Sequence, residues 1–141
     1  MAITQSMTTS FKVDLLAGTQ DFDADTFKIA LYTSSANLGA ATTTYTTTGE
    51  VPSTGNYTAG GNTLTVSVTP TSTGTTAFIS FANTTWSAAT ITARGALIYN
   101  SSKSNKAVAV LDFGSDKTST AGTFTVQFPA NNATDAVVRI A

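Results

Sequence analysis

The sequence contains neither cysteine nor histidine in its 141 residues. Without cysteine, disulfide bonds and thiolate zinc sites are excluded. Without histidine as well, the chain cannot form imidazole metal sites or the Ser-His-Asp and Cys-His nucleophile systems of hydrolases. We therefore expect a protein that is not an enzyme and that needs no cofactor.

Charge and long apolar runs are also scarce. Charged residues are 11% of the composition, the formal net charge is -1, and no run of Lys or Arg is present to attract nucleic acid or an anionic membrane. No stretch approaches the roughly 20 apolar residues that span a bilayer, and the N-terminal sequence lacks the basic and apolar regions of a secretory signal. We expect a soluble protein, used without a secretory signal, that binds neither nucleic acid nor membrane.

One short helix is predicted near the N-terminus. Ser10 is a candidate N-cap, Phe11 and Leu15 lie one helical turn apart, and Gly18 is placed to end the helix. Residues 1–9 before it are predicted to form an extended, exposed arm that orders on a neighbouring subunit.

The rest of the chain shows the alternation of apolar and polar residues that is typical of strands separated by turns rich in Gly, Asn, Ser and Thr. Eight segments carry this pattern: 26–33, 63–69, 77–82, 95–100, 107–113, 123–128, 136–141 and, more weakly, 45–51. Residues 95–100 and 107–113 are apolar on both faces, which predicts central strands covered on both sides. The pattern predicts an all-β fold, a single β-sandwich domain over residues 1–141 with about eight strands.

Asp21, Asp23 and Asp25 occupy the first three ligand positions of a calcium-binding loop. The sixth position holds Thr26 where the loop needs Gly, and the twelfth holds Tyr32 where it needs a bidentate Glu. We therefore disfavour a metal site and predict that these side chains cap backbone N–H groups.

Asp112 is an acid within an apolar strand, so it must face water, an interface, or a partner such as Arg94 or Arg139. The aromatic residues Trp86, Tyr45, Tyr57 and Tyr99 have two interpretations: they line a carbohydrate-binding face or a subunit interface, or they close the core. The candidate interface residues are Trp86, Tyr99, Asp112 and Arg94.

Several phrases, taken in order over nearly the whole chain, resemble small structural proteins of tailed bacteriophages, some of which are head decoration (cement) proteins. The phrases are SFKVDLLAG, DTFKIALYTSSA, YTAGGNTLT, ARGALIYN, VAVLDFGSDKT and GTFTVQFP. The match covers framework phrases, and no functional residue is carried over by motif.

The resemblance implies a β-sandwich of jelly-roll type that binds the outer surface of the assembled capsid. It also implies a homo-oligomer, a dimer or trimer, that bridges subunits of the major capsid protein. Two alternatives stay open. One is a tail, fibre or receptor-binding module whose aromatic residues contact host glycans. The other is a small glycosidase-like enzyme, although no paired acid motif is visible.

Overall fold

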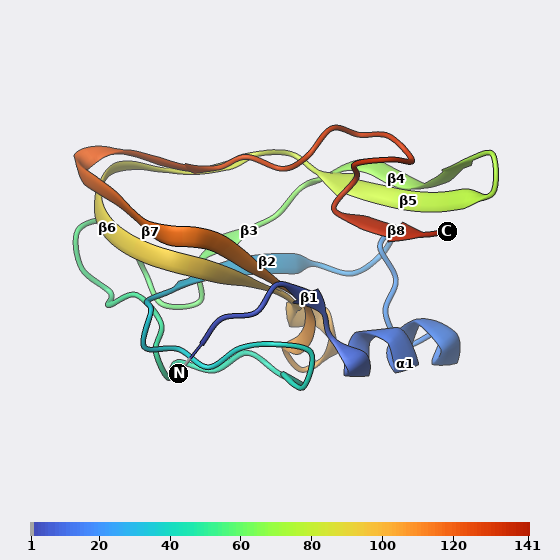
Figure 1. Cartoon of the computed structure of the whole chain (residues 1–141), viewed down its shortest axis with the longest axis horizontal. Helices are drawn as coiled ribbons and strands as arrows, with labels where there is room; N and C mark the ends of the chain where they lie inside the picture. The colour runs from blue at the N-terminus through green and yellow to red at the C-terminus, as the bar shows by residue number, and fades with distance from the viewer. Residues whose placement is uncertain (1) are drawn as a thin grey trace.

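The chain folds into two antiparallel β-sheets with one short helix at one end of the molecule (Figure 1). The structure is a computed structural model that describes residues 2–141. The larger sheet has the strand order β1-β7-β6-β2-β3 and the smaller one the order β4-β5-β8. The elements, in chain order, are β1 (Ser6–Met7), α1 (Thr9–Ala17), β2 (Phe27–Tyr32), β3 (Asn62–Thr63), β4 (Val66–Thr73), β5 (Thr76–Phe81), β6 (Thr84–Asn100), the 3-10 turn η1 (Ser101–Lys103), β7 (Lys106–Val126) and β8 (Val138–Ile140).

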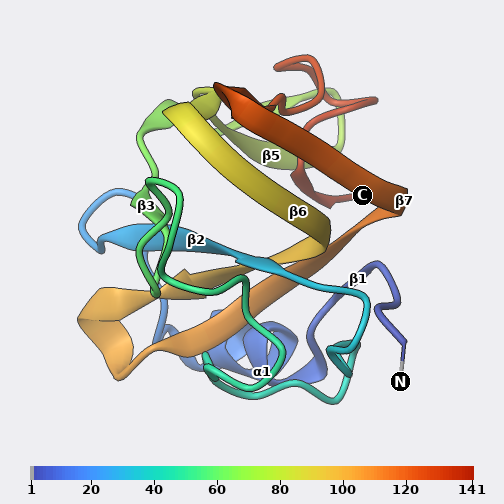
Figure 2. The same cartoon turned by 90° about the vertical axis from the view of Figure 1, so that its left-hand side faces the viewer.

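The hairpin of β6 and β7 extends through both layers. Figures 1 and 2 show the two strands bending together at the end of the molecule opposite α1 and returning beside the smaller sheet. At the bend, the pairing register shifts on both sides of Ala89, and Ala88 and Ala121 have positive φ angles of 48° and 47°. Such bulges bend a strand and increase its twist, so a long strand can pass from one layer to the other.

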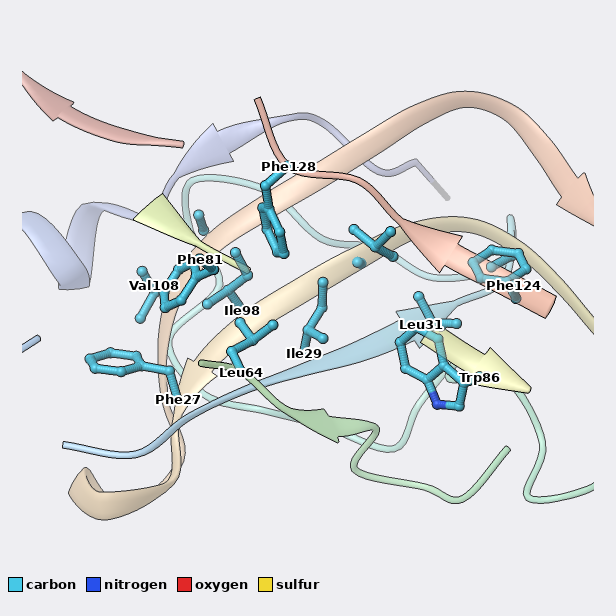
Figure 3. Packing of buried hydrophobic residues seen from close by; sticks show 14 of the residues in the cluster. Phe27, Ile29, Leu31, Leu64, Phe81, Trp86, Ile98, Val108, Phe124 and Phe128 are labelled. Carbon is cyan, nitrogen blue, oxygen red and sulfur yellow. The ribbon is translucent and has the colours of Figure 1, made fainter. Parts of the chain in front are cut away.

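The main core lies between the two layers (Figure 3). It receives Phe27, Ile29 and Leu31 from β2, and Phe81 from β5, all almost fully buried. This confirms the inward face predicted for residues 26–33.

A second core covers the opposite face of the larger sheet. There, Tyr32, Leu97 and Val110 pack against Ile3 and Leu38, which come from the N-terminal segment and the loop after β2. Residues 95–100 are buried throughout, because β6 is central and both of its faces are covered. The prediction of a doubly covered central strand is confirmed.

The helix begins before the predicted N-cap. The Thr8 side chain, not that of Ser10, accepts a hydrogen bond from the Phe11 N–H at 3.2 Å. Thr8 is fully buried and its own N–H donates to the Val108 carbonyl on β7 at 3.0 Å, so contact with the sheet selects Thr8 over Ser10. Gly18 ends the helix in the left-handed conformation, as predicted, with φ of 69°.

The N-terminal segment is part of the domain, which corrects the prediction of an exposed arm over residues 1–9. Ile3 is buried and forms a bridge with Leu38, and β1 pairs with β7 in the register Ser6↔Val110. Met1 lies outside the described residues. The segment is extended, but its apolar side chains and backbone groups find their partners within the chain.

Two strand predictions also need correction. Residues 107–113 and 123–126 belong to one continuous strand, because Lys117, Thr118, Ser119 and Gly122 between them pair with β6, whereas Gln127 and Phe128 lie beyond its end. Residues 45–51 form a loop held by single bridges, such as Tyr32↔Glu50. Within residues 2–141, no helix is both long and apolar enough to cross a membrane.

We predict a large difference between two glycine substitutions in this fold. Gly61 and Gly74 both have positive φ, 72° and 61°, but a Cβ at Gly61 would overlap the carbonyl oxygen of Ile29 on β2, whereas no heavy atom lies within 4 Å of one at Gly74. Gly74→Ala should lower the free energy of unfolding by about 1 kcal/mol through backbone strain alone. Gly61→Ala should lower it by at least about 2 kcal/mol more, because β2 or the loop must move. Urea denaturation measures both, and equal losses would contradict the close approach at Gly61.

Candidate functional site

A carboxylate and four tyrosines form a polar cluster beneath the loop of residues 43–61. We call it the tyrosine cluster: Glu50 with Tyr32, Tyr45, Tyr57 and Tyr99, the four tyrosines of the sequence. Glu50 Oε2 accepts a hydrogen bond from the Tyr45 hydroxyl at 2.6 Å, and Oε1 accepts one from the Tyr57 hydroxyl at 2.7 Å. Glu50 therefore links two tyrosines through one carboxylate.

Backbone groups complete the tyrosine cluster. The Gly60 N–H donates to Glu50 Oε1 at 2.7 Å, and the Tyr99 hydroxyl donates to the Gly60 carbonyl at 2.7 Å. Gly60 has φ of 95°, a conformation that glycine adopts without steric cost, so this turn can present both of its backbone groups inward. The Tyr57 hydroxyl also accepts from the Leu31 N–H on β2 at 2.9 Å. The loop is thereby fastened to the central strands of the larger sheet.

The environment of the tyrosine cluster keeps its hydroxyls protonated. Burial, followed by the negative charge of Glu50, raises the pKa of Tyr99 to about 12. Burial is also the first cause that raises the pKa of Tyr32, Tyr45 and Tyr57. A neutral phenol beside a carboxylate is a hydrogen-bond donor and a poor nucleophile, so the geometry is that of a structural clamp.

A second polar network joins α1 to the end of β6. Gln20 Nε2 donates to Asp14 Oδ2 at 2.9 Å, and Asn100 Nδ2 donates to Gln20 Oε1 at 3.2 Å and to Asp25 Oδ2 at 2.8 Å. Asp14, Gln20 and Asn100 are buried. Because buried polar groups are costly unless they are paired, this network fixes the position of α1 on the sheet.

Two of the three aspartates of the predicted turn, Asp21 and Asp25, cap backbone N–H groups, as the sequence indicated, whereas Asp23 takes part through its backbone N–H. Asp21 Oδ1 accepts from the Asp23 N–H at 2.8 Å, and Asp25 Oδ2 accepts from the Asp21 N–H at 3.0 Å. Burial acts to raise the pKa of Asp25, but hydrogen bonds from Asn100 and Asp21 and the charge of Lys103 together hold it below its ordinary value. No group of three His, Cys, Asp or Glu residues in the described part of the chain could hold a metal ion.

The structure separates the four residues of the predicted interface into two groups. Trp86 and Tyr99 are buried, at 5% and 2% exposure, so the expectation that they contact a partner is corrected. The Trp86 ring lies 5.9 Å from that of Tyr57 and 6.1 Å from that of Phe124, centroid to centroid. Figure 3 shows Trp86 and Phe124 within the packed core. These aromatic residues close the core, as the second interpretation had it.

Arg94 and Asp112 form an ion pair that remains half-exposed. Arg94 Nε donates to Asp112 Oδ1 at 3.0 Å, which confirms Arg94 as the predicted partner, and the Gly114 N–H donates to the same oxygen at 2.9 Å. The hydrogen bond from Gly114, and then that from Arg94, hold the pKa of Asp112 below its ordinary value.

The outward side of the bent β6–β7 hairpin is lined by hydroxyl side chains. Thr85 and Thr125 are cross-strand partners, as are Thr92 and Thr118, whose hydroxyl oxygens lie 3.3 Å apart. All four are exposed, because strand neighbours alternate between faces and Trp86 and Phe124 point inward. We call these four residues, with the Arg94–Asp112 pair, the threonine face. Its two charges are of opposite sign, and Thr118 and Thr125 also line a hollow of about 430 Å³. Sequence reasoning missed this face because residues 84–92 were not recognised as strand.

A hollow of about 710 Å³ opens between β7 and the C-terminal segment, and both Asp112 and Asp135 line it. A glycosidase needs one carboxylic acid whose pKa is raised. Asp112 has the opposite shift, and Asp135 accepts a hydrogen bond from Asn132 Nδ2 at 3.1 Å. The lowered pKa of Asp112 is the opposite of what a general acid requires.

Comparison with protein-family models, with curated proteins and with solved structures finds no match for the chain. The similarity to phage virion proteins therefore stays a prediction from the sequence phrases.

The tyrosine cluster predicts a distinctive alkaline titration. The unfolded tyrosines ionise near pH 10, whereas the folded ones hold their protons to higher pH. The unfolded state then binds fewer protons, so the contribution of these groups to stability is complete below pH 10 and is lost as the pH rises toward about 12. Tyrosinate absorbance measures this: at about pH 11, one unit above the ordinary pKa of 10, the native protein should show little of it and the urea-unfolded protein should show most of it. A tyrosine that titrates normally in the native protein would contradict the clamp.

The ion pair predicts an acid titration with two separable causes. By NMR, the carboxyl of Asp112 should titrate below its ordinary value of 3.8. Arg94→Ala should raise this pKa only in part, because the Gly114 N–H is the larger cause. A return to the ordinary value in Arg94→Ala would show that the arginine alone is responsible, and no change would show that the pair does not form in solution.

Proposed function

We propose that the chain is a structural protein of a tailed-phage virion that decorates the assembled head. In this proposal it binds the outer surface of the capsid, bridges subunits of the major capsid protein and acts as a small homo-oligomer. We also propose that the two sheets are connected with jelly-roll topology. The sequence phrases that resemble phage virion proteins supply the class of protein, and the threonine face supplies the candidate contact surface.

The threonine face is the observation that carries this proposal. It lies on a bent pair of strands, and its charges, Arg94 and Asp112, neutralise each other. Interfaces of this polar kind gain specificity from shape complementarity and hydrogen bonds, and weak contacts become stable when several are linked. Many copies on a regular shell meet that condition.

The polar clusters inside the domain support a binding role over a chemical one. Glu50, Asp14 and Asp25 all accept hydrogen bonds from neighbouring side chains of the same domain, and these hydrogen bonds join the loops and the helix to the sheets. The receptor-binding alternative relied on exposed aromatic residues, and Trp86 and Tyr99 are in the core. We therefore place it second.

The proposal predicts that one added charge on the threonine face weakens capsid binding. Thr92→Glu should raise the protein concentration needed for half occupancy of the heads by about tenfold or more, because the added carboxylate would be desolvated without a partner. Ser72→Glu is the matched control, since it adds the same charge at an exposed strand position of β4. Co-sedimentation with heads of the phage that encodes the chain measures binding, and cryo-EM locates it.

Wild-type protein that is found on the tail, or that leaves isolated heads undecorated, would overturn the proposed function. Equal binding by Thr92→Glu and Ser72→Glu would retain the function and reject the threonine face as the contact surface.

A further inference from the structure

The exposed large apolar side chains of the described residues gather at one end of the molecule. Val13 and Leu16 on α1 are 59% and 93% exposed, and Ile140 on β8 is 56% exposed. Figure 1 shows α1 and β8 at the same end, opposite the bend of β6 and β7. Apolar residues scattered singly on a surface need no explanation, but a group of them that borders a groove marks an interaction site.

The groove lies between α1 and the smaller sheet and has a volume of about 360 Å³. Its apolar walls are formed by Leu15, Phe22, Phe78, Ile79, Val138 and Ile140. Asp21 is the one charged residue among the described residues that line it. We call it the end groove.

The helix presents apolar side chains on two sides, and one side faces away from the domain. Phe11 is fully buried against the core, while Val13 and Leu16, three residues apart, are neighbours on the exposed side. Lys12 lies one turn before Leu16 on that same side. The domain itself therefore leaves an apolar ridge with one positive charge beside an apolar groove with one negative charge.

We propose that the end groove binds a second copy of this chain in a two-fold symmetric dimer. A protrusion and a hollow that border each other on one surface are self-complementary, because a two-fold axis places each Leu16 in the other copy's end groove. The same operation brings Lys12 toward the partner subunit's Asp21. Neither residue forms a salt bridge in the part of the chain that the structure describes, so both charges are available for the contact.

This inference deepens the proposed function by giving the homo-oligomer a surface and a symmetry. The bend of β6 and β7 lies at the far end of each copy from α1 (Figure 1), and the two threonine pairs of the threonine face lie on either side of it in the β6–β7 register. Two copies joined at their α1 ends would direct their threonine faces away from each other. Such a dimer can contact two capsid subunits at once.

Sedimentation equilibrium of the full chain tests the dimer. We expect the wild type to sediment as a dimer and Leu16→Glu to shift the dissociation constant by more than about a hundredfold, because each dimer loses two buried leucines and gains two buried charges. Thr92→Glu is the matched control, since it adds the same charge at the opposite end and should remain a dimer. Leu16 is nearly fully exposed in the single chain, so Leu16→Glu should fold with an unchanged thermal midpoint at concentrations where the wild type is monomeric.

Charge reversal tests the register of the dimer. Lys12→Asp should weaken dimerisation by about tenfold, and adding Asp21→Lys in the same chain should restore it. Wild-type protein that is a monomer or a trimer, or a dimer that Leu16→Glu leaves intact, would overturn the inference.

The two proposals fail separately. A monomer that still decorates heads would reject the dimer and retain the function, whereas a dimer that binds no heads would do the reverse. Loss of head binding in Leu16→Glu with a monomeric wild type would show that the end groove takes a capsid segment, which also overturns the inference.

Discussion

The bend shared by β6 and β7 is the constraint on which the two-layer arrangement depends. Ala88 and Ala121 adopt left-handed backbone angles that residues other than glycine rarely adopt, so contacts with neighbouring residues must stabilise this conformation. Asn56 Nδ2 donates to the Ala88 carbonyl at 2.8 Å, and the Thr90 N–H donates to the Gly55 carbonyl at 2.9 Å. Both contacts come from the loop that the tyrosine cluster fastens to β2. The half-buried carboxylate of Glu50, the loop and the bend are therefore linked by successive hydrogen bonds.

Local patterns were sufficient for the parts of the fold that local physics decides. Alternation identified β2, Gly18 marked the end of α1, and Asp21 and Asp25 cap their own turn. Arg94 was one of the two arginines considered as partners of Asp112.

Long-range geometry decides what the sequence did not reveal. Residues 114–122 have the composition of a turn, yet Lys117, Thr118, Ser119 and Gly122 among them pair with β6, and no sequence signal marks an alanine at positive φ. The sequence did not decide whether the tyrosines lie at an interface or in the core, because their partners, such as Leu31 for Tyr57, are distant in the sequence. The threonine face and the end groove both arise only when segments from different parts of the chain meet. The domain consequently carries hydroxyl side chains on either side of the bend and an apolar groove near α1.

The pairing of the outermost strands sets the order in which the parts of this chain can fold. The β6–β7 hairpin forms between segments that are neighbours in the sequence. By contrast, β1 can pair only after Val110 has been synthesised, and the second edge of β5 is covered only after Val138 has been synthesised. Pairings across such separations pay a large loop-closure cost and form late. Once β5 has left the ribosome, one of its strand edges therefore stays uncovered until β8 has been synthesised, a period in which the nascent protein is open to chaperones and to misassociation.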